Sequence, residues 1–81
     1  MQKNRLLKRI VIDPKIMCGK PVIKGTRLTV QRVLDLHAQG VSTEEVLAEY
    51  KGLEIADILA CFLFASKALD QSSFVPLTSE H

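Results

Sequence analysis

Basic side chains are concentrated at the front of this 81-residue chain, where they could bind phosphate groups. Residues 1–32 hold nine of the eleven Lys and Arg residues and one acid, a formal charge of +8. The rest of the chain carries two bases against eight acids, a formal charge of −6. Neutralising phosphates gives a sequence-independent attraction to nucleic acid. We therefore expect nucleic acid to bind the front of the chain and a polypeptide to face the acidic half.

Two groups of these cations are candidate DNA contacts. The first is a basic N-terminal arm over residues 1–8, together with Arg9, the residue that follows it. It could lie along a DNA backbone or in its minor groove, and a solvated terminus is the alternative. The second group lies on a loop bracketed by glycines, where Arg27 could read a guanine edge or the loop could simply hold a tight turn. The candidate DNA-binding residues are Lys3, Arg5, Lys8, Arg9, Lys20, Lys24 and Arg27.

The sequence does not assemble a catalytic site. It offers no acid–base pair, no nucleophile beside a base and no metal-ligand spacing, so we expect no enzyme, no metal and no cofactor. The segment from Gly19 to Thr26 lacks the spacing and the lysine of a P-loop, which argues against nucleotide binding. Cys18 and Cys61 are expected to be free thiols. Because we find neither a secretory signal nor a bilayer-length apolar run, we expect a cytoplasmic protein that binds no membrane.

A short β element is predicted to carry the loop cations. The β-branched run from Arg9 to Ile12 favours a strand, and Asp13-Pro14 ends it because proline disfavours regular structure at the residue before it. The glycines that follow suit an extended loop or hairpin. The residues assigned to turns and caps in the whole chain are Gly19, Pro21, Gly25, Thr26, Ser42, Glu45 and Gly52.

Local capping signals predict the first two helices. Thr29 can cap a helix that Gly40 ends. Ser42 and Glu45 have the spacing of a capping box at the start of the next helix. Gly52 suits a left-handed cap at its end.

The third and longest helix is predicted from Ile55 to about Leu69 and is apolar nearly all round. We expect its core-facing arc to hold Ile55, Ile58, Leu59, Phe62, Leu63, Ala65 and Leu69. The opposite face, which also carries Asp57, would then be covered by a partner. Phe64 on that face is either ordinary core or the anchor of a homodimer or toxin interface. The predicted interface residues are Ala60, Cys61, Phe64 and Ala68.

These elements predict a mainly α fold with a short N-terminal β element. Residues 9–69 would form one trihelical helix-turn-helix domain, homeodomain-like or winged-helix-like, with the β and loop element at 9–28, the helices at 29–69 and a flexible tail at 70–81. The third helix of such a domain normally enters the major groove. Here Glu54 and Asp57 would meet the phosphates, so the charges argue against that role.

The stretches IDP at 12–14, GKPVIKGTRLTV at 19–30, GVSTEEV at 40–46 and DI at 57–58 resemble the bacterial family called domain of unknown function 433. The resemblance covers about residues 9–69. It implies a small dimer with an N-terminal β element and a trihelical helix-turn-helix, which acts as the antitoxin of a nuclease-like (PIN-fold) toxin. Lys51 stands where the family tends to have proline, and Glu54 where it has Ser or Thr. Without a hydroxyl cap, the third helix is expected to begin weakly.

Two functions fit the charge distribution, the predicted fold and the family resemblance. The first is the antitoxin of a type II toxin–antitoxin pair, a dimeric autoregulator whose basic half binds operator DNA and whose acidic half neutralises the toxin from an adjacent gene. Phe74, Val75 and Leu77 in the tail could add to the toxin contact. The alternative is a protein-only dimerisation module without DNA binding, which Glu54 and Asp57 favour.

Overall fold

The computed structural model describes residues 3–71, which contain four α-helices and one two-stranded sheet. The elements are α1 (Lys3–Leu7), β1 (Ile10–Val11), the 3-10 helix η1 (Met17–Gly19), β2 (Val22–Ile23), α2 (Val30–Ala38), α3 (Thr43–Glu49) and α4 (Ile55–Asp70). The expected mainly α fold with a short N-terminal β element is confirmed. The tail from residue 72, with Phe74, Val75 and Leu77, lies outside the described residues.

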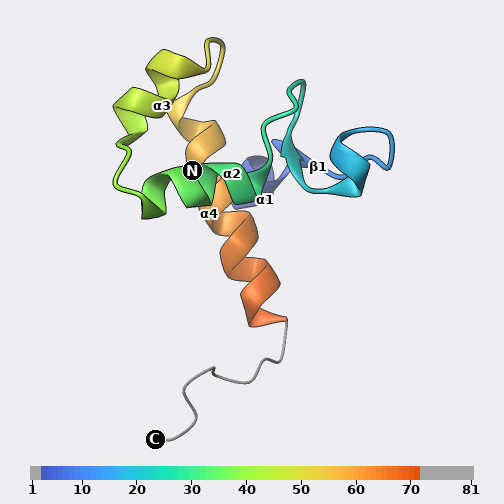
Figure 1. Ribbon diagram of the computed structural model, residues 1–81. Helices are drawn as coiled ribbons and strands as arrows, with labels where there is room; N and C mark the ends of the chain where they lie inside the picture. Colours follow the sequence, from blue (N-terminus) through green and yellow to red (C-terminus); the bar gives the residue numbers. More distant parts are fainter. Residues whose placement is uncertain (1–2, 72–81) are drawn as a thin grey trace, which may run out of the picture.

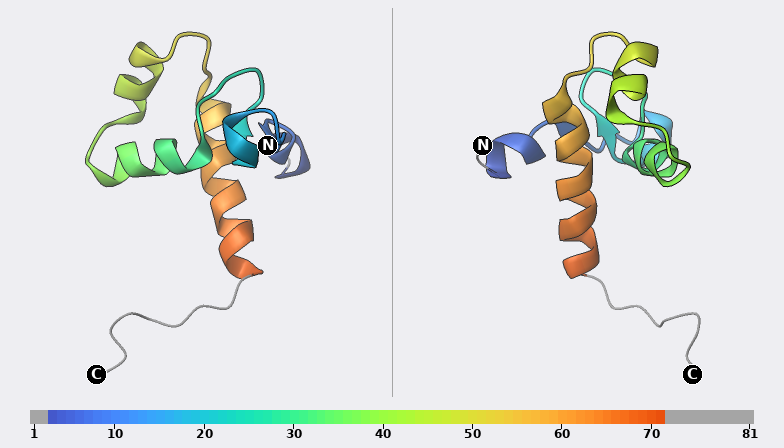
Figure 2. Two further views of the ribbon diagram at one scale, coloured as in Figure 1. Left: turned by 45° about the vertical axis from the view of Figure 1, so that its right-hand side comes forward. Right: turned by 90° about the vertical axis from the view of Figure 1, so that its left-hand side faces the viewer.

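The longest helix, α4, is the centre of the fold. It contacts α1, α2, α3 and β1, and it stands between α1 on one side and α2 on the other (Figures 1 and 2). Its C-terminal half projects beyond the other elements in all views. Within residues 3–71, none of the helices combines the length and apolar character needed to cross a bilayer.

Lys3–Leu7 form helix α1, where the sequence predicts a basic arm over residues 1–8. In α1, Leu6 packs against the core and Leu7 is half-buried, while Lys3 and Arg5 are exposed. A segment of five residues is too short to be a stable helix alone. It is held here because α4 offers an apolar surface for its leucines, so α1 belongs to the folded domain.

The β element is a short hairpin-like pair. β1 and β2 run antiparallel, with Ile10 opposite Ile23 and Val11 opposite Val22. A turn follows β2, in which the Thr26 backbone N–H donates to the Ile23 carbonyl at 3.0 Å and the Thr26 hydroxyl donates to the same oxygen at 2.8 Å. Gly25 has φ +81° at the third position of this turn, as a type II turn requires.

Each of the three later helices begins at a side-chain cap. The Thr29 hydroxyl accepts the Arg32 N–H at 3.0 Å at the start of α2. At α3, the Ser42 hydroxyl accepts the Glu45 N–H at 3.1 Å, and the Glu45 carboxylate accepts the Ser42 N–H at 2.9 Å. The expected weak start of α4 is not seen, because the Asp57 carboxylate accepts the Glu54 N–H at 2.8 Å.

The core shows that the two faces of α4 were assigned the wrong way round. Asp57, Ile58, Ala60 and Cys61 are buried, although all but Ile58 were placed on the outer face. Ile55, Leu59, Phe62 and Leu69, expected in the core, are exposed. The core cluster of buried residues is Ile10, Ile23, Leu28, Val30, Val33, Val46, Ile58, Ala60 and Cys61.

The capping box at α3 makes a pH-dependent prediction. The Ser42 backbone N–H, and after it the Ser42 hydroxyl, hold the pKa of Glu45 below its ordinary value of 4.5. A carboxyl group whose pKa is lower in the folded state stabilises that state above the unfolded pKa, and the contribution disappears as the pH falls through the folded value. Glu45→Gln keeps a hydrogen-bond acceptor but loses the charge. We expect it to be less stable than the wild type at neutral pH.

This stability difference should shrink as the pH falls below 4.5, which urea denaturation from neutral pH to about pH 3 would measure. Glu44→Gln is the matched control, because Glu44 lies in the same first turn and has no role in the box. A difference for Glu45→Gln that persists unchanged in acid would contradict the assignment.

Candidate nucleic-acid and protein interfaces

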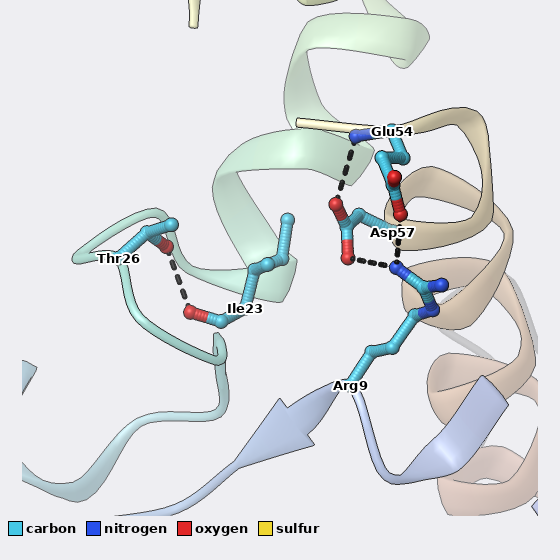
Figure 3. Close-up of polar contacts among 5 residues, drawn as sticks. All are labelled: Arg9, Ile23, Thr26, Glu54 and Asp57. Carbon is cyan, nitrogen blue, oxygen red and sulfur yellow. Dashed lines mark hydrogen bonds and ion pairs between the residues drawn. The ribbon is translucent and has the colours of Figure 1, made fainter. Parts of the chain in front are cut away.

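Arg9 joins the β element to the start of α4 through an ion-pair cluster (Figure 3). Its Nη1 donates to Glu54 Oε1 at 2.9 Å and to Asp57 Oδ1 at 3.0 Å. Asp57 is almost fully buried and also accepts the Glu54 N–H, so it serves the ion pair and the helix start together. The hydrogen bond that Arg9 donates to Glu54, and after it the one that Arg9 donates to Asp57, raises the pKa of Arg9.

This cluster corrects the assignment of Arg9 to DNA binding, because its charge is already matched by two carboxylates of the same chain. Among residues 3–71, Arg9 is the one predicted DNA contact that has an ion pair. The sequence missed this contact because its partners lie 45 and 48 residues away.

The remaining predicted DNA contacts are exposed but are distributed over separate surfaces. Those on and after α1 are Lys3, Arg5 and Lys8, and those on the loops around β2 are Lys20, Lys24 and Arg27. Lys3 borders a hollow against the C-terminal half of α4, whereas Lys20 borders one between α2 and α4. The structure therefore places Lys20 and Arg27 beside α2 and leaves the α1 cations on the other side of α4.

Arg27 borders a third hollow with two cations that the sequence did not single out. These are Arg32 on α2 and Lys51 at the corner between α3 and α4. We call this hollow, of about 880 Å³, the basic groove. The fold alone shows that three segments bring these cations to one place.

The outward face of α4 carries a continuous apolar stripe, which we call the α4 seam. Its large side chains, Ile55, Leu59, Phe62 and Leu69, are 43–61% exposed. With the exposed Ser66 they follow one another at alternating spacings of four and three, the 3.5-residue period of a helix that pairs with another helix. The Phe62 ring meets His37 edge-on at 5.3 Å, which braces the seam from α2.

The predicted interface residues fall into two groups. Ala60 and Cys61 are completely buried within the chain, which corrects their assignment to an interface. Burial, and to a lesser degree the charge of Asp57, raises the pKa of the Cys61 thiol to about 12, so this thiol stays neutral. Phe64 packs against the core and, with Ala68 and Leu34, lines an apolar hollow of about 380 Å³ between α2 and α4. Phe64 is thus largely core.

Two comparisons with known proteins indicate the same family, and a third finds an uncharacterised relative. The family model described as "Protein of unknown function (DUF433)" matches residues 10–65. An uncharacterised protein of Archaeoglobus fulgidus is 62% identical over 24 residues, which span 30% of this chain and 67% of that protein. The crystal structure of a DUF433 member from Anabaena variabilis superimposes with a TM-score of 0.74 at 29% identity, over 84% of this chain and 67% of that one.

The ion-pair cluster predicts unequal costs for its two acids. Asp57→Ala removes a buried carboxylate, the acceptor for the Glu54 N–H and one partner of Arg9, and should lower the free energy of unfolding by about 2–3 kcal/mol. The side chain of Glu54 is 68% exposed, so Glu54→Ala should cost less than about 1 kcal/mol. Urea denaturation at low salt measures both. Equal losses of unfolding free energy in the two variants would show that the exposed Arg9–Glu54 pair matters as much as the buried Arg9–Asp57 pair. That result would contradict the prediction.

Proposed function

Because the chain belongs to the DUF433 family, whose description leaves its function open, we propose that it is the antitoxin of a type II toxin–antitoxin pair. In this proposal it dimerises, binds the DNA upstream of its own gene and neutralises a nuclease-like (PIN-fold) toxin encoded next to it. The observation that carries the proposal is the α4 seam, a helix-pairing stripe that residues 3–71 leave exposed.

The seam supports a protein partner on energetic grounds. Fully burying one large aliphatic or aromatic side chain contributes about 1.5–3 kcal/mol, and the seam holds four of them about half in water. A second copy of α4 presents the same period and can interdigitate with it. Dimerisation through α4 would therefore stabilise a domain too small to bury much apolar surface alone.

The acidic side of the molecule supports the toxin contact. Glu44, Glu45 and Glu49 are exposed along α3. A nuclease groove that holds RNA must be electropositive, so an acidic helix is suited to cover it. The seam and this helix lie on different elements, and one dimer could use both.

The loop cations support DNA binding by contacts to phosphates. Lys20, Lys24 and Arg27 are exposed, and none forms an ion pair within the described part of the chain. Helix α3 and the start of α4 do not share this character, since α3 begins with acids and the start of α4 carries Glu54 and Asp57. We therefore propose that loops, and not an inserted helix, hold the DNA backbone.

A protein-only module without DNA binding is the second candidate. It is favoured by the Arg9 cluster, because the charge of this predicted DNA contact is matched by Glu54 and Asp57 of the same chain. Both candidates use the α4 seam, and only the first needs the loop cations.

The seam is tested by Leu59→Asp. A charge in the centre of the stripe should convert a dimer of the wild type into a folded monomer, as measured by light scattering after gel filtration and by circular dichroism. Ile12→Asp is the matched control, because Ile12 is 61% exposed on a loop outside the seam. A monomeric wild type at high micromolar concentration, or a dimeric Leu59→Asp, would contradict the seam as a dimer interface.

DNA binding is tested with the duplex upstream of the gene, using fluorescence anisotropy across a salt series. Lys20→Gln and Lys24→Gln should each flatten the dependence of log K on log salt by about one unit per lost phosphate contact. Lys67→Gln, an exposed lysine near the end of α4, is the charge-matched control. An unchanged slope for both loop variants, or no binding at low salt, would favour the protein-only module.

A further inference from the structure

The basic groove is formed by three segments that are distant in sequence. The loop before α2 contributes Arg27, α2 contributes Arg32, and the corner between α3 and α4 contributes Lys51. Figure 2 shows that loop and that corner at the same end of the molecule. A volume of about 880 Å³ lies within the range of about 300–1,000 Å³ typical of ligand pockets.

The charge of the groove favours an anionic occupant. Arg27, Arg32 and Lys51 are exposed at its border, and none of them has an ion pair within residues 3–71. Glu49 is the one acid among the lining residues. Cations from separate elements around one hollow create a positive potential that an acidic ligand would neutralise.

The interior of the groove distinguishes between classes of anion. Leu28, Tyr50 and Leu53 give it apolar walls. The two threonine hydroxyls in the lining are already engaged, since Thr26 bonds the Ile23 carbonyl and the Leu28 N–H, and Thr29 caps α2. The rest of the lining is mostly apolar or cationic, and its cations can pair with the carboxylates of a peptide. A peptide in which carboxylates flank an apolar side chain is more complementary to this lining than a nucleotide is.

Backbone strain supports a specialised role for the same wall. Met17 and the adjacent Cys18 have φ of +49° and +58°, a region that residues with side chains rarely adopt. Met17 lines the groove and stays 39% exposed. Such conformations concentrate at binding sites, where the surrounding structure holds them in place. An unbranched, polarisable Met side chain also adapts readily to a bound apolar group.

We propose that the basic groove binds an acidic peptide segment of a partner protein, with one large apolar side chain held between Tyr50, Leu53 and Met17. Carboxylates on either side of that anchor pair with Arg27, Arg32 and Lys51. This site is separate from the α4 seam and requires neither dimerisation nor DNA binding.

The probe is a fluorescein-labelled peptide, Glu-Asp-Phe-Leu-Glu-Asp, titrated into the full chain at low salt. Binding should weaken as NaCl is added, and Arg27→Gln or Arg32→Gln should each weaken it by about fivefold. Replacing the Phe and Leu of the peptide by Ser should weaken it by about tenfold. Lys15→Gln, which removes an exposed charge outside the groove, should change the affinity less than about twofold.

NMR chemical shifts of the backbone amides of the isotope-labelled protein locate the bound peptide. They also distinguish between the outcomes. Perturbations at Arg27, Tyr50 and Leu53, with the expected order of variants, support the proposal. The proposal is overturned if millimolar peptide leaves these amides unmoved, or if Lys15→Gln weakens binding as much as Arg27→Gln. It is also overturned if a thymidine hexanucleotide binds the groove more tightly than the peptide, since the site would then serve nucleic acid.

Discussion

The contact between Arg9 and Asp57 fixes the orientation of α4, and the exposed surfaces of the protein follow from that orientation. A buried carboxylate is tolerated only where it is paired and hydrogen-bonded, and Asp57 meets both conditions through the Arg9 guanidinium and the Glu54 N–H. Ala60 and Cys61 on the same side of the helix are thereby turned into the core. The α4 seam is left outside because it lies opposite these residues.

Local signals in the sequence predicted the caps of α2 and α3, because both partners of each contact lie within three residues. Thr29 bonds the N–H of Arg32, and Ser42 and Glu45 bond each other. The inward face of α4 could not be predicted in this way. The helix is apolar nearly all round, so its period is uninformative, and Asp57 indicated a solvent-facing side although its partner lies 48 residues earlier. The same absence of a local partner hid α1, which is ordered by α4 and not by its own sequence.

For the candidate sites, composition predicted which residues are available for binding, and only the fold showed which of them lie together. Residue types indicated that the loop cations were available for anions, and Lys20, Lys24 and Arg27 are indeed exposed. Composition could not show that the α1 cations lie across α4 from them, nor that Arg32 and Lys51 meet Arg27 at one groove. Those groupings depend on how the corner between α3 and α4 approaches the loop before α2, which no spacing in the sequence encodes.

The acidic start of α4 affects how the proposed activities combine. In a helix-turn-helix protein that inserts its last helix into DNA, that helix is unavailable to another partner. Here the start of α4 is acidic, and its carboxylates pair with Arg9 of the same chain. The loop cations and the cations at the border of the basic groove form no ion pair within residues 3–71. Contacts to phosphates through the loops would leave the seam and the acidic helix α3 uncovered. DNA on the loops and a protein partner on the seam or on α3 would then occupy different surfaces, and binding of one need not displace the other. A peptide in the basic groove, in contrast, would compete with DNA for Arg27.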